Sequence, residues 1–494
     1  MASRRNQLKA VNTFILIATL MVSSAAISAD KDLLDILLAN GVITPAQHAE
    51  LLQKEIITLE DIAPQNDPGG FDVPVTDKPP AKIDAAIDER IDNKVAEAVE
   101  SAIESDSSVK ASYGSSGFRL ETRDGNWQTN LQWRAQLRYT SPYSGDPRQI
   151  SAFDAQSEST FEPRRLRMKI GGHGYQPWLK YYFEVDLQPS RDPDSSSSSS
   201  STRVIDWRID VAKWDWGTLR VGQWKVDLNR ERGDSSGRQQ FVERSIVNRT
   251  FTIDRQVGIQ LRGHLFKNTP ADLRYYAGVF NGEGRGVRDN DTGKMYVGRL
   301  QWNFLGRDLS WRQSDVEYTE RPTGSLAIGG ATTQGSCTRW SSSGCGNLDG
   351  YTSAAAATSD QFEVDQFVQE FAFKYRGLSI QQEYHRKTVN DRGAGTENDL
   401  TGGYFQSGYF FHNLFPSIPA PLELAVRYAF VDEPNSIDRA FENEREELTF
   451  GANWFFSGHN NKLTLDMSHL SLEDGLVSRS ESDNRLRLQW DVSF

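Results

Sequence analysis

The sequence predicts an all-β fold: a 16-stranded antiparallel transmembrane β-barrel with a short α-helical N-terminal extension on the periplasmic side. Three observations support this. Only 37% of the 494 residues are hydrophobic, and beyond the N-terminus no stretch approaches the ~20 consecutive apolar residues that a transmembrane helix needs. From residue 113 to the end, apolar and polar residues alternate with a period of two, as in strands with one lipid-facing side. The connections between these segments alternate between long and short.

The first 29 residues are typical of an export signal peptide. Arg4 and Arg5 provide a basic start, Phe14–Val22 an apolar core that is short for a membrane span, and Ala29 a small residue before the cleavage point. The basic run also resembles a twin-arginine signal, so general secretion and the twin-arginine route both stay open. Either route brings the mature chain to an oxidising compartment.

Residues 30–112 divide into three parts. Residues 30–64 are predicted to form short helices. Leucines between 33 and 38 lie on one face of the first helix, Gly41 ends that helix, and Thr44-Pro45 begins the second. Residues 65–80 are a linker rich in Pro, Gly and Asp. Residues 81–112 are predicted to form an amphipathic helix with apolar residues every four positions, and a coiled coil is the alternative. These parts hold 18 acidic and seven basic side chains, so most of the net charge of -12 lies here.

Residues 113–494 are predicted to form the barrel. In the segment 127–139, apolar residues such as Trp133 alternate with polar ones such as Arg134, and the last segment ends at Phe494 in the same pattern. Strands of this length fit a tilted bilayer crossing of ~9–11 residues. The predicted strands are near 126–139, 162–173, 178–187, 203–213, 217–225, 256–266, 271–280, 294–303, 310–318, 366–376, 378–388, 402–412, 422–431, 445–456, 460–471 and 484–494.

The segment 310–318 alternates least regularly of these sixteen. The connections support the count, because long ones such as 226–255 and 319–365 alternate with tight turns such as Arg376-Gly377. Long loops at one end and short turns at the other are typical of outer-membrane barrels. An even number of strands leaves both ends of the barrel on the periplasmic side, and a β-sandwich would not need this asymmetry.

The two cysteines, Cys337 and Cys345, lie in one Ser/Gly-rich segment. In an oxidising compartment they are predicted to pair as a local disulfide in an extracellular loop. A metal site is not predicted, because no second pair of Cys or His lies nearby. No cofactor is predicted.

The charge of the predicted lumen points to anions. If the apolar residues face lipid, the other face of the strands holds seventeen basic and ten acidic side chains. A basic wall inside a low-dielectric tube raises the local anion concentration, and anion pores select with rings of Arg and Lys. The alternative is that the lumen arginines merely pair with carboxylates on neighbouring strands. The pore-lining candidates on strands are Arg164, Arg165, Arg167, Lys169, Asp206, Arg208, Arg220, Arg262 and Arg299.

Several runs resemble the phosphate-selective porin O and P family. They are FEPRRLR at 161–167, LRVGQWK at 219–225, DRQVGIQL at 254–261, GVFNG at 278–282 and GYFQ at 403–406. The resemblance covers nearly the whole mature chain and implies a sixteen-stranded trimeric porin whose third long loop, here about 226–255, folds into the channel.

The resemblance also implies which residues hold the anion. The family's paired arginines match Arg164 and Arg165, its loop serines match Ser235 and Ser236, and its aspartate matches Asp206. The sequence departs from the family at two positions. Arg232 stands where the family has a loop lysine, and Arg167 replaces a tyrosine. These departures leave the choice of phosphate open, but not the preference for anions, because Arg offers bidentate recognition where Lys is a point charge.

The expected partners are phosphate-like inorganic anions, the lipid bilayer with lipopolysaccharide, two further copies of the chain in a homotrimer, and the outer-membrane assembly machinery. Nucleic acid is not expected from an acidic chain. An enzyme is not predicted, because the seven His are scattered without a catalytic pattern. Two alternatives remain: a general or sugar-permeable porin, and an envelope-anchoring barrel whose N-terminal helices bind peptidoglycan or a partner.

Overall fold

The computed structural model describes most of the barrel region. The predicted signal peptide, the linker and almost all of the N-terminal helical region lie outside the described residues. The chain forms two units, residues 1–93 and 94–494, and the barrel belongs to the second. No helix in the described part of the chain is both long and apolar enough to cross a membrane. The described residues are Pro45, 109–142, 159–187, 202–287, 293–341, 344–348, 350–434, 442–474 and 479–494.

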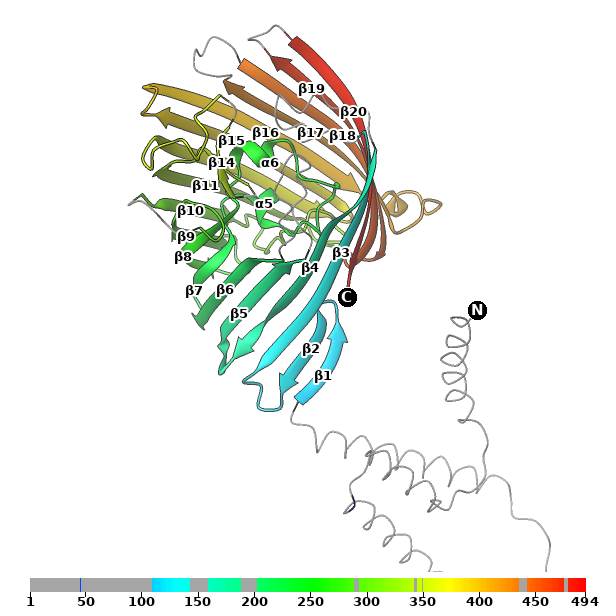
Figure 1. Ribbon diagram of the computed structural model, residues 1–494. Helices are drawn as coiled ribbons and strands as arrows, with labels where there is room; N and C mark the ends of the chain where they lie inside the picture. The colour runs from blue at the N-terminus through cyan, green and yellow to red at the C-terminus, as the bar shows by residue number, and fades with distance from the viewer. Residues whose placement is uncertain are drawn as a thin grey trace, which may run out of the picture. The chain divides into compact units, whose positions relative to one another are not determined.

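The predicted closed antiparallel barrel of sixteen strands is confirmed (Figure 1). Its strands are β3 (Gln128–Ser141), β4 (Thr160–Gly174), β5 (Gln176–Asp186), β6 (Arg203–Trp214), β7 (Gly217–Lys225), β8 (Arg255–Leu265), β9 (Leu273–Phe280), β10 (Met295–Trp302), β11 (Thr323–Gly335), β14 (Phe362–Tyr375), β15 (Leu378–Asp391), β16 (Thr396–Tyr409), β17 (Leu422–Pro434), β18 (Glu442–Ser457), β19 (Asn461–Asp474) and β20 (Arg479–Ser493).

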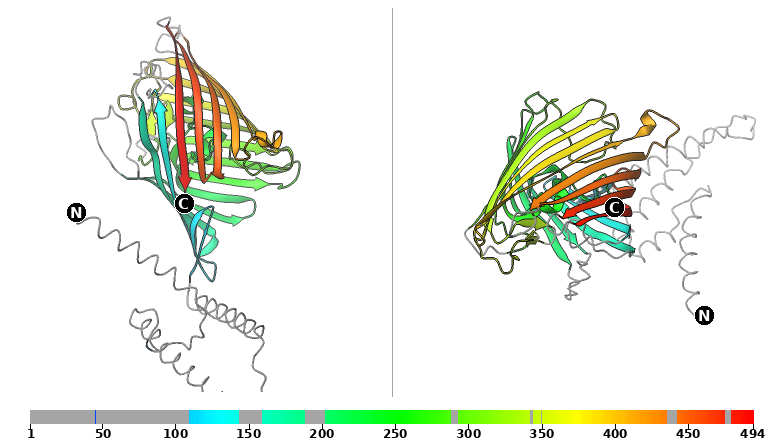
Figure 2. Two further views of the ribbon diagram at one scale, coloured as in Figure 1. Left: turned by 90° about the vertical axis from the view of Figure 1, so that its right-hand side faces the viewer. Right: turned by 90° about the horizontal axis from the view of Figure 1, so that it is seen from above.

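The barrel closes between its first and last strands. β20 pairs with β3 from Leu486 opposite Ser141 to Ser493 opposite Arg134, and the long strands β17–β20 lie side by side in the wall (Figure 2). The end of the barrel where β3 begins and β20 finishes is termed the terminal rim, and the opposite end the far rim.

The two faces of the wall differ as the alternation predicts. On β10, the arginine Arg299 is 2% exposed, whereas its neighbour Leu300 is 47% exposed. The exposed face thus holds the large apolar side chains that suit contact with lipid. They include Trp133, Leu137, Ile259, Leu300, Phe367, Phe450, Leu488 and Trp490.

A hairpin precedes the barrel. β1 (Val109–Gly114) pairs with β2 (Gly117–Thr122), and β2 pairs with β3 through Phe118 opposite Leu131. The hairpin therefore pairs with the first residues of β3, beyond the residues that pair with β20. Residues 109–112 were expected at the end of the amphipathic helix, and they are strand instead.

The strand predicted at 310–318 is wrong, and the strand of this region is β11. Residues 303–322 are a connection at the terminal rim. β11 alternates too, but its buried face holds small residues, because the neighbouring loop lies very close: a Cβ on Gly329 would be 2.8 Å from the carbonyl oxygen of Leu228. Because β11 has few large side chains, the contrast between its apolar and polar positions is weak in the sequence.

The two cysteines form a disulfide in the loop between β11 and β14. Cys337 and Cys345 have Cα atoms 5.7 Å apart. Within this loop, β12 (Arg339–Ser341) pairs with β13 (Gly344–Gly346) as a small separate hairpin.

Candidate functional site

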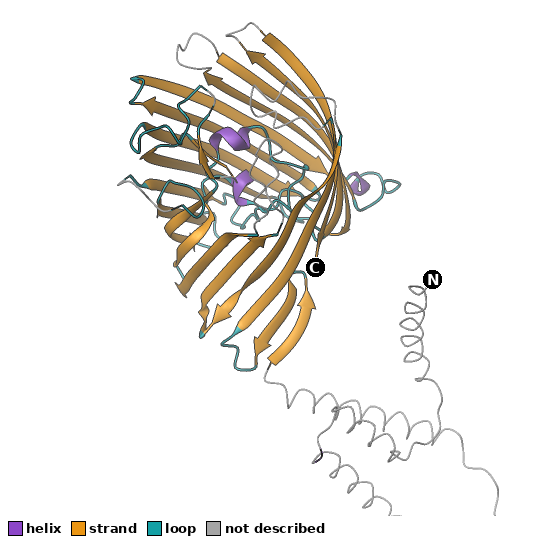
Figure 3. Cartoon of the chain, in the orientation of Figure 1, coloured by secondary structure: helices purple, strands orange, loops and turns teal. Residues whose placement is uncertain are grey.

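The connection 226–254 between β7 and β8 folds into the barrel. It contains two short helices, α5 (Arg230–Gly233) and α6 (Val247–Phe251), which lie inside the ring of strands (Figure 3). Its apolar side chains are buried and join one cluster with side chains of the wall, among them Val368 and Leu400. The infolded loop, as 226–254 is named here, therefore fills one side of the lumen.

Carboxylates of the wall anchor the infolded loop. Glu383 on β15 accepts hydrogen bonds from the Glu231 backbone N–H at 2.6 Å and from Asn229 at 2.9 Å. Further round the wall, Asp466 on β19 accepts from the Val242 backbone N–H at 2.9 Å. These bonds fix the loop against the half of the wall that runs from β14 to β19.

Burial shifts the ionisation of the loop's own charges. It raises the pKa of Glu231 above the ordinary value of 4.5, and the nearby Glu383 carboxylate raises it further. It also raises the pKa of Asp234. Burial, followed by repulsion from the Arg232 guanidinium, lowers the pKa of Arg244 to about 10. The loop therefore holds its charges in a poorly solvated environment.

A cavity of about 880 Å³ remains on the other side of the lumen. It lies between strands β3–β8, the infolded loop and the connection 303–322. Basic side chains outnumber acidic ones in its lining by nine to six, so its field favours anions. The basic side chains are Arg167, Lys169, Lys180, Arg208, Arg220, Lys225, Arg238, Arg262 and Arg312, and the acidic ones Glu184, Asp206, Asp210, Asp227, Asp234 and Glu317.

Seven of the twelve predicted pore residues line this one cavity. They are Arg167, Lys169, Asp206, Arg208, Arg220, Ser235 and Arg262. The other five, Arg164, Arg165, Arg232, Ser236 and Arg299, do not line it.

The paired arginines of β4 meet the infolded loop. Arg164 and Arg165 contact Glu243 at 3.2 and 3.3 Å, and Arg138 of β3 contacts the same carboxylate at 2.9 Å. A second carboxylate, Glu162, lies 3.9 Å from Arg164, so three guanidinium groups share two carboxylates. Arg164 is the most accessible of the three, with 37% of its side chain exposed.

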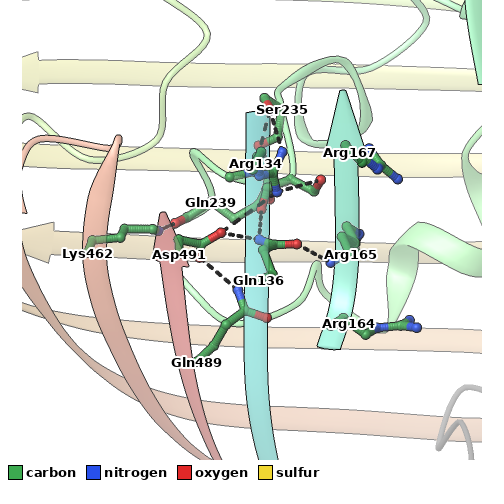
Figure 4. Close-up of polar contacts among 12 residues, drawn as sticks. Arg134, Gln136, Arg164, Arg165, Arg167, Ser235, Gln239, Lys462, Gln489 and Asp491 are labelled. Carbon is green, nitrogen blue, oxygen red and sulfur yellow. Dashed lines mark hydrogen bonds and ion pairs between the residues drawn. The ribbon is translucent and has the colours of Figure 1, made fainter. Parts of the chain in front are cut away.

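Ser235 and Ser236 contact Arg134, one of the seventeen basic side chains predicted to face the lumen but not one of the twelve site candidates. The Arg134 guanidinium donates to the two hydroxyls at 3.3 and 3.1 Å. Figure 4 shows Arg134 beside Ser235, with Asp491 and Gln136 in the same polar cluster. The serine hydroxyls are thus positioned by the wall.

Most of the predicted strand arginines are in ion pairs, as the alternative interpretation expected. Arg167 contacts Glu184 at 2.9 Å, Arg220 contacts Asp210 at 2.7 Å, Arg262 contacts Asp227 at 3.1 Å, and Arg299 contacts Glu370 at 2.6 Å. The predicted aspartate, Asp206, is engaged by Arg255 at 2.6 Å. The loop arginine predicted as a ligand, Arg232, is buried and contacts Asp254.

Four cations of the cavity have weaker partners. Among the residues that the structure describes, the Lys169 ammonium donates a hydrogen bond only to the Gln132 amide oxygen, at 3.3 Å. Arg208 lies over the Tyr182 ring at 4.3 Å, with its closest carboxylate, Asp210, 4.0 Å away. Within the described residues, the exposed side chains of Lys180 and Arg238 have no hydrogen-bond or ion-pair partner. These four are the best placed to meet a passing anion.

Arg238 was not among the predicted pore residues. In the sequence it is one of six arginines between 230 and 255, and nothing in the pattern separates an exposed one from a buried one. A Cβ on Gly237 would lie 2.6 Å from the Arg134 guanidinium carbon, so the loop passes tightly against the wall there.

The family model described as phosphate-selective porin O and P matches residues 137–494. Solved structures similar to the chain include a loop-deletion mutant of OmpT, an outer membrane protein of Vibrio cholerae (TM-score 0.48, 11% identity, 74% of this chain and 99% of that chain covered). They also include the outer membrane channel DcaP of Acinetobacter baumannii (0.47, 11%, 74% and 97%) and an anion-selective porin from Comamonas acidovorans (0.45, 10%, 74% and 99%). No curated protein matches the chain.

Proposed function

Because the chain belongs to the phosphate-selective porin O and P family and forms an outer-membrane barrel, we propose that it is a porin whose lumen conducts anions in preference to cations. Phosphate, pyrophosphate and related oxyanions are the proposed solutes. The proposal includes the homotrimer, contact with lipopolysaccharide, insertion by the outer-membrane assembly machinery, and a periplasmic N-terminal extension at the terminal rim.

One observation supports anion preference above the others: the cavity beside the infolded loop has more basic than acidic lining residues, and its cations Lys169, Lys180, Arg208 and Arg238 are weakly paired or unpaired within the described chain. A partly dehydrated oxyanion there exchanges water for guanidinium and ammonium donors, and such charge-assisted bonds are strong. Several moderate sites also suit conduction better than one deep site, because an ion must leave as well as enter.

The pairing of the strand arginines favours a second candidate, a general or sugar-permeable porin with weak selectivity. Arg167, Arg220, Arg262 and Arg299 each contact a carboxylate. If those pairs cancel the field of the lumen, little preference for anions remains.

The reversal potential of the purified protein in a planar bilayer under a KCl gradient separates the two candidates. We expect a potential showing that chloride permeates better than potassium, and a chloride current that added phosphate reduces. A potential near that of free diffusion would favour the general porin. A preference for potassium would contradict the proposed role of the cavity.

A further inference from the structure

The connection 303–322 at the terminal rim folds into the barrel. Its side chains Gln313, Ser314 and Asp315 are 4%, 1% and 2% exposed. The connection 410–421 at the same rim behaves differently, because Leu414 and Phe415 there are 62% and 56% exposed. The length of a connection at this rim therefore does not by itself explain why 303–322 folds inward.

The inward position of 303–322 is fixed by the wall. Ser314 donates to Glu423 at 2.8 Å, and its carbonyl accepts from Lys374 at 2.8 Å. Asp315 accepts from the Gly377 backbone N–H at 2.8 Å, at the neighbouring turn between β14 and β15. Glu423 and Lys374 are both buried, so their contacts with Ser314 are shielded from water.

The same segment contacts the infolded loop from the terminal side. The Gln313 amide oxygen accepts from the Gln240 backbone N–H at 2.7 Å, and its amide nitrogen donates to the Gln239 side chain at 3.0 Å. Arg230 of α5 donates to the Ser310 carbonyl. One glutamine thus joins two consecutive residues of the infolded loop.

The Trp311 ring also packs against the infolded loop. A Cβ on Gly233 of α5 would lie only 1.7 Å from a Trp311 ring carbon, so the ring lies directly on the backbone of the loop. On its other side the ring contacts the Arg299 guanidinium at 4.9 Å and the Tyr276 ring at 6.2 Å. Trp311 therefore connects the loop to the wall at β9 and β10.

We infer that the segment 303–322 is a buttress that holds the infolded loop in place from the terminal side and so sets the cross-section of the pore. The wall anchors the loop on its β14–β19 side, and the buttress prevents it from moving toward the terminal rim. Gln313 is a positioning residue that acts through Gln239 and Gln240, whereas Trp311 packs on Gly233 and also lines the cavity itself. This inference rests on the proposed channel function.

The test compares single-channel conductance and selectivity of full-length variants in planar bilayers. One variant replaces residues 305–320 with a short Gly-Asn-Gly turn. The matched control replaces residues 412–420, which belong to the outward-facing connection, in the same way. We expect the first variant to raise conductance by about two-fold or more and to lower the chloride-to-potassium permeability ratio, since an unsupported loop opens the constriction. The control should match the wild type.

A second variant changes less of the chain, so it tests the inference even if the first variant does not fold. Gln313→Ala keeps Trp311, Ser314 and Asp315, and hence the lining of the cavity and the bonds to the wall. It should show an intermediate conductance and a noisier open current. Wild-type conductance and selectivity in this variant, when it migrates as a folded barrel before boiling, would overturn the inference.

The two proposals fail in different ways. A wild-type pore without anion preference contradicts the proposed function, while the conductance comparison still decides on the buttress. An anion-selective wild type whose buttress variants are unchanged overturns the buttress alone. An equal rise in conductance in the 412–420 control would also overturn it, because the effect would then not be specific to 303–322.

Discussion

Two arginines six positions apart in the infolded loop have opposite environments. Arg232 is 7% exposed and contacts Asp254, whereas Arg238 is exposed to the cavity. The resemblance to the family could identify the loop and its serines, but the exposure of each arginine depends on how closely the loop approaches the wall. That approach is visible only in three dimensions, where Gly237 lies against Arg134.

Arg238→Gln is predicted to lower anion preference, because it removes a cavity charge that has no partner in the described chain. Block of the chloride current by phosphate should weaken by about ten-fold, as for the loss of one charge-assisted hydrogen bond. The reversal potential and a phosphate titration measure the two effects. Arg232→Gln is the matched comparison: it should lower the urea midpoint of unfolding, since it removes the partner of the buried Asp254. An unchanged potential in Arg238→Gln would contradict the prediction.

Glu231 predicts a pH dependence of stability. Its pKa in the folded protein lies above 4.5 because of burial and the Glu383 carboxylate, so the folded state binds the proton more tightly than the unfolded chain. The contribution of this group to stability is therefore complete below 4.5 and is lost as the pH rises through the raised pKa. Glu231→Gln should flatten the rise in urea midpoint on acidification from pH 7 toward 4.5. Parallel profiles for wild type and variant would count against the assignment.

At the scale of elements, alternation predicts a strand when its outward side chains are large and its inward ones clearly polar. Fifteen of the sixteen predicted segments overlap strands of the barrel. β11 was missed because its buried face contains Ser325, Ala327 and Gly329, which leave room for the infolded loop. The strand was predicted instead at 310–318, where the alternation is the least regular of the sixteen segments. Tertiary packing determined both outcomes.

The hairpin β1–β2 gives a prediction with a built-in control. Gly114 and Gly117 face each other across its turn, but a Cβ on Gly117 would lie 2.2 Å from the Leu131 carbonyl oxygen, and its φ is 84°. A Cβ on Gly114 would meet no described atom within 4 Å, apart from its neighbours in the chain. Gly117→Ala should therefore separate β2 from β3 and lower the urea midpoint, because the added Cβ clashes with the Leu131 carbonyl oxygen and strains the positive φ. Gly114→Ala should not. Equal midpoints would refute the close packing of the hairpin on β3.

At the scale of the whole molecule, charge is divided along the chain. Residues 30–112 hold 18 acidic and seven basic side chains, whereas the cavity of the barrel has a basic excess. The sequence was sufficient to predict the number of strands, which follows from periodicity, and the acidity of residues 30–112, which follows from a count. It was not sufficient to predict which arginines pair, because partners such as Arg167 and Glu184 meet only through strand register.

The division of charge yields a prediction that separates a porin from an envelope tether. Removing residues 30–108, with the signal peptide kept, leaves the hairpin and every barrel strand in place. In a porin the charges that select among ions are those of the lumen, and every charge that lines the cavity stays in the truncated chain. The truncated chain should therefore keep its conductance and anion preference in planar bilayers. Raising the salt to 1 M should reduce the preference equally in the full and truncated chains. Loss of the current on truncation would mean that the extension is part of the pore, and an intact current with a detached cell envelope would support the tether.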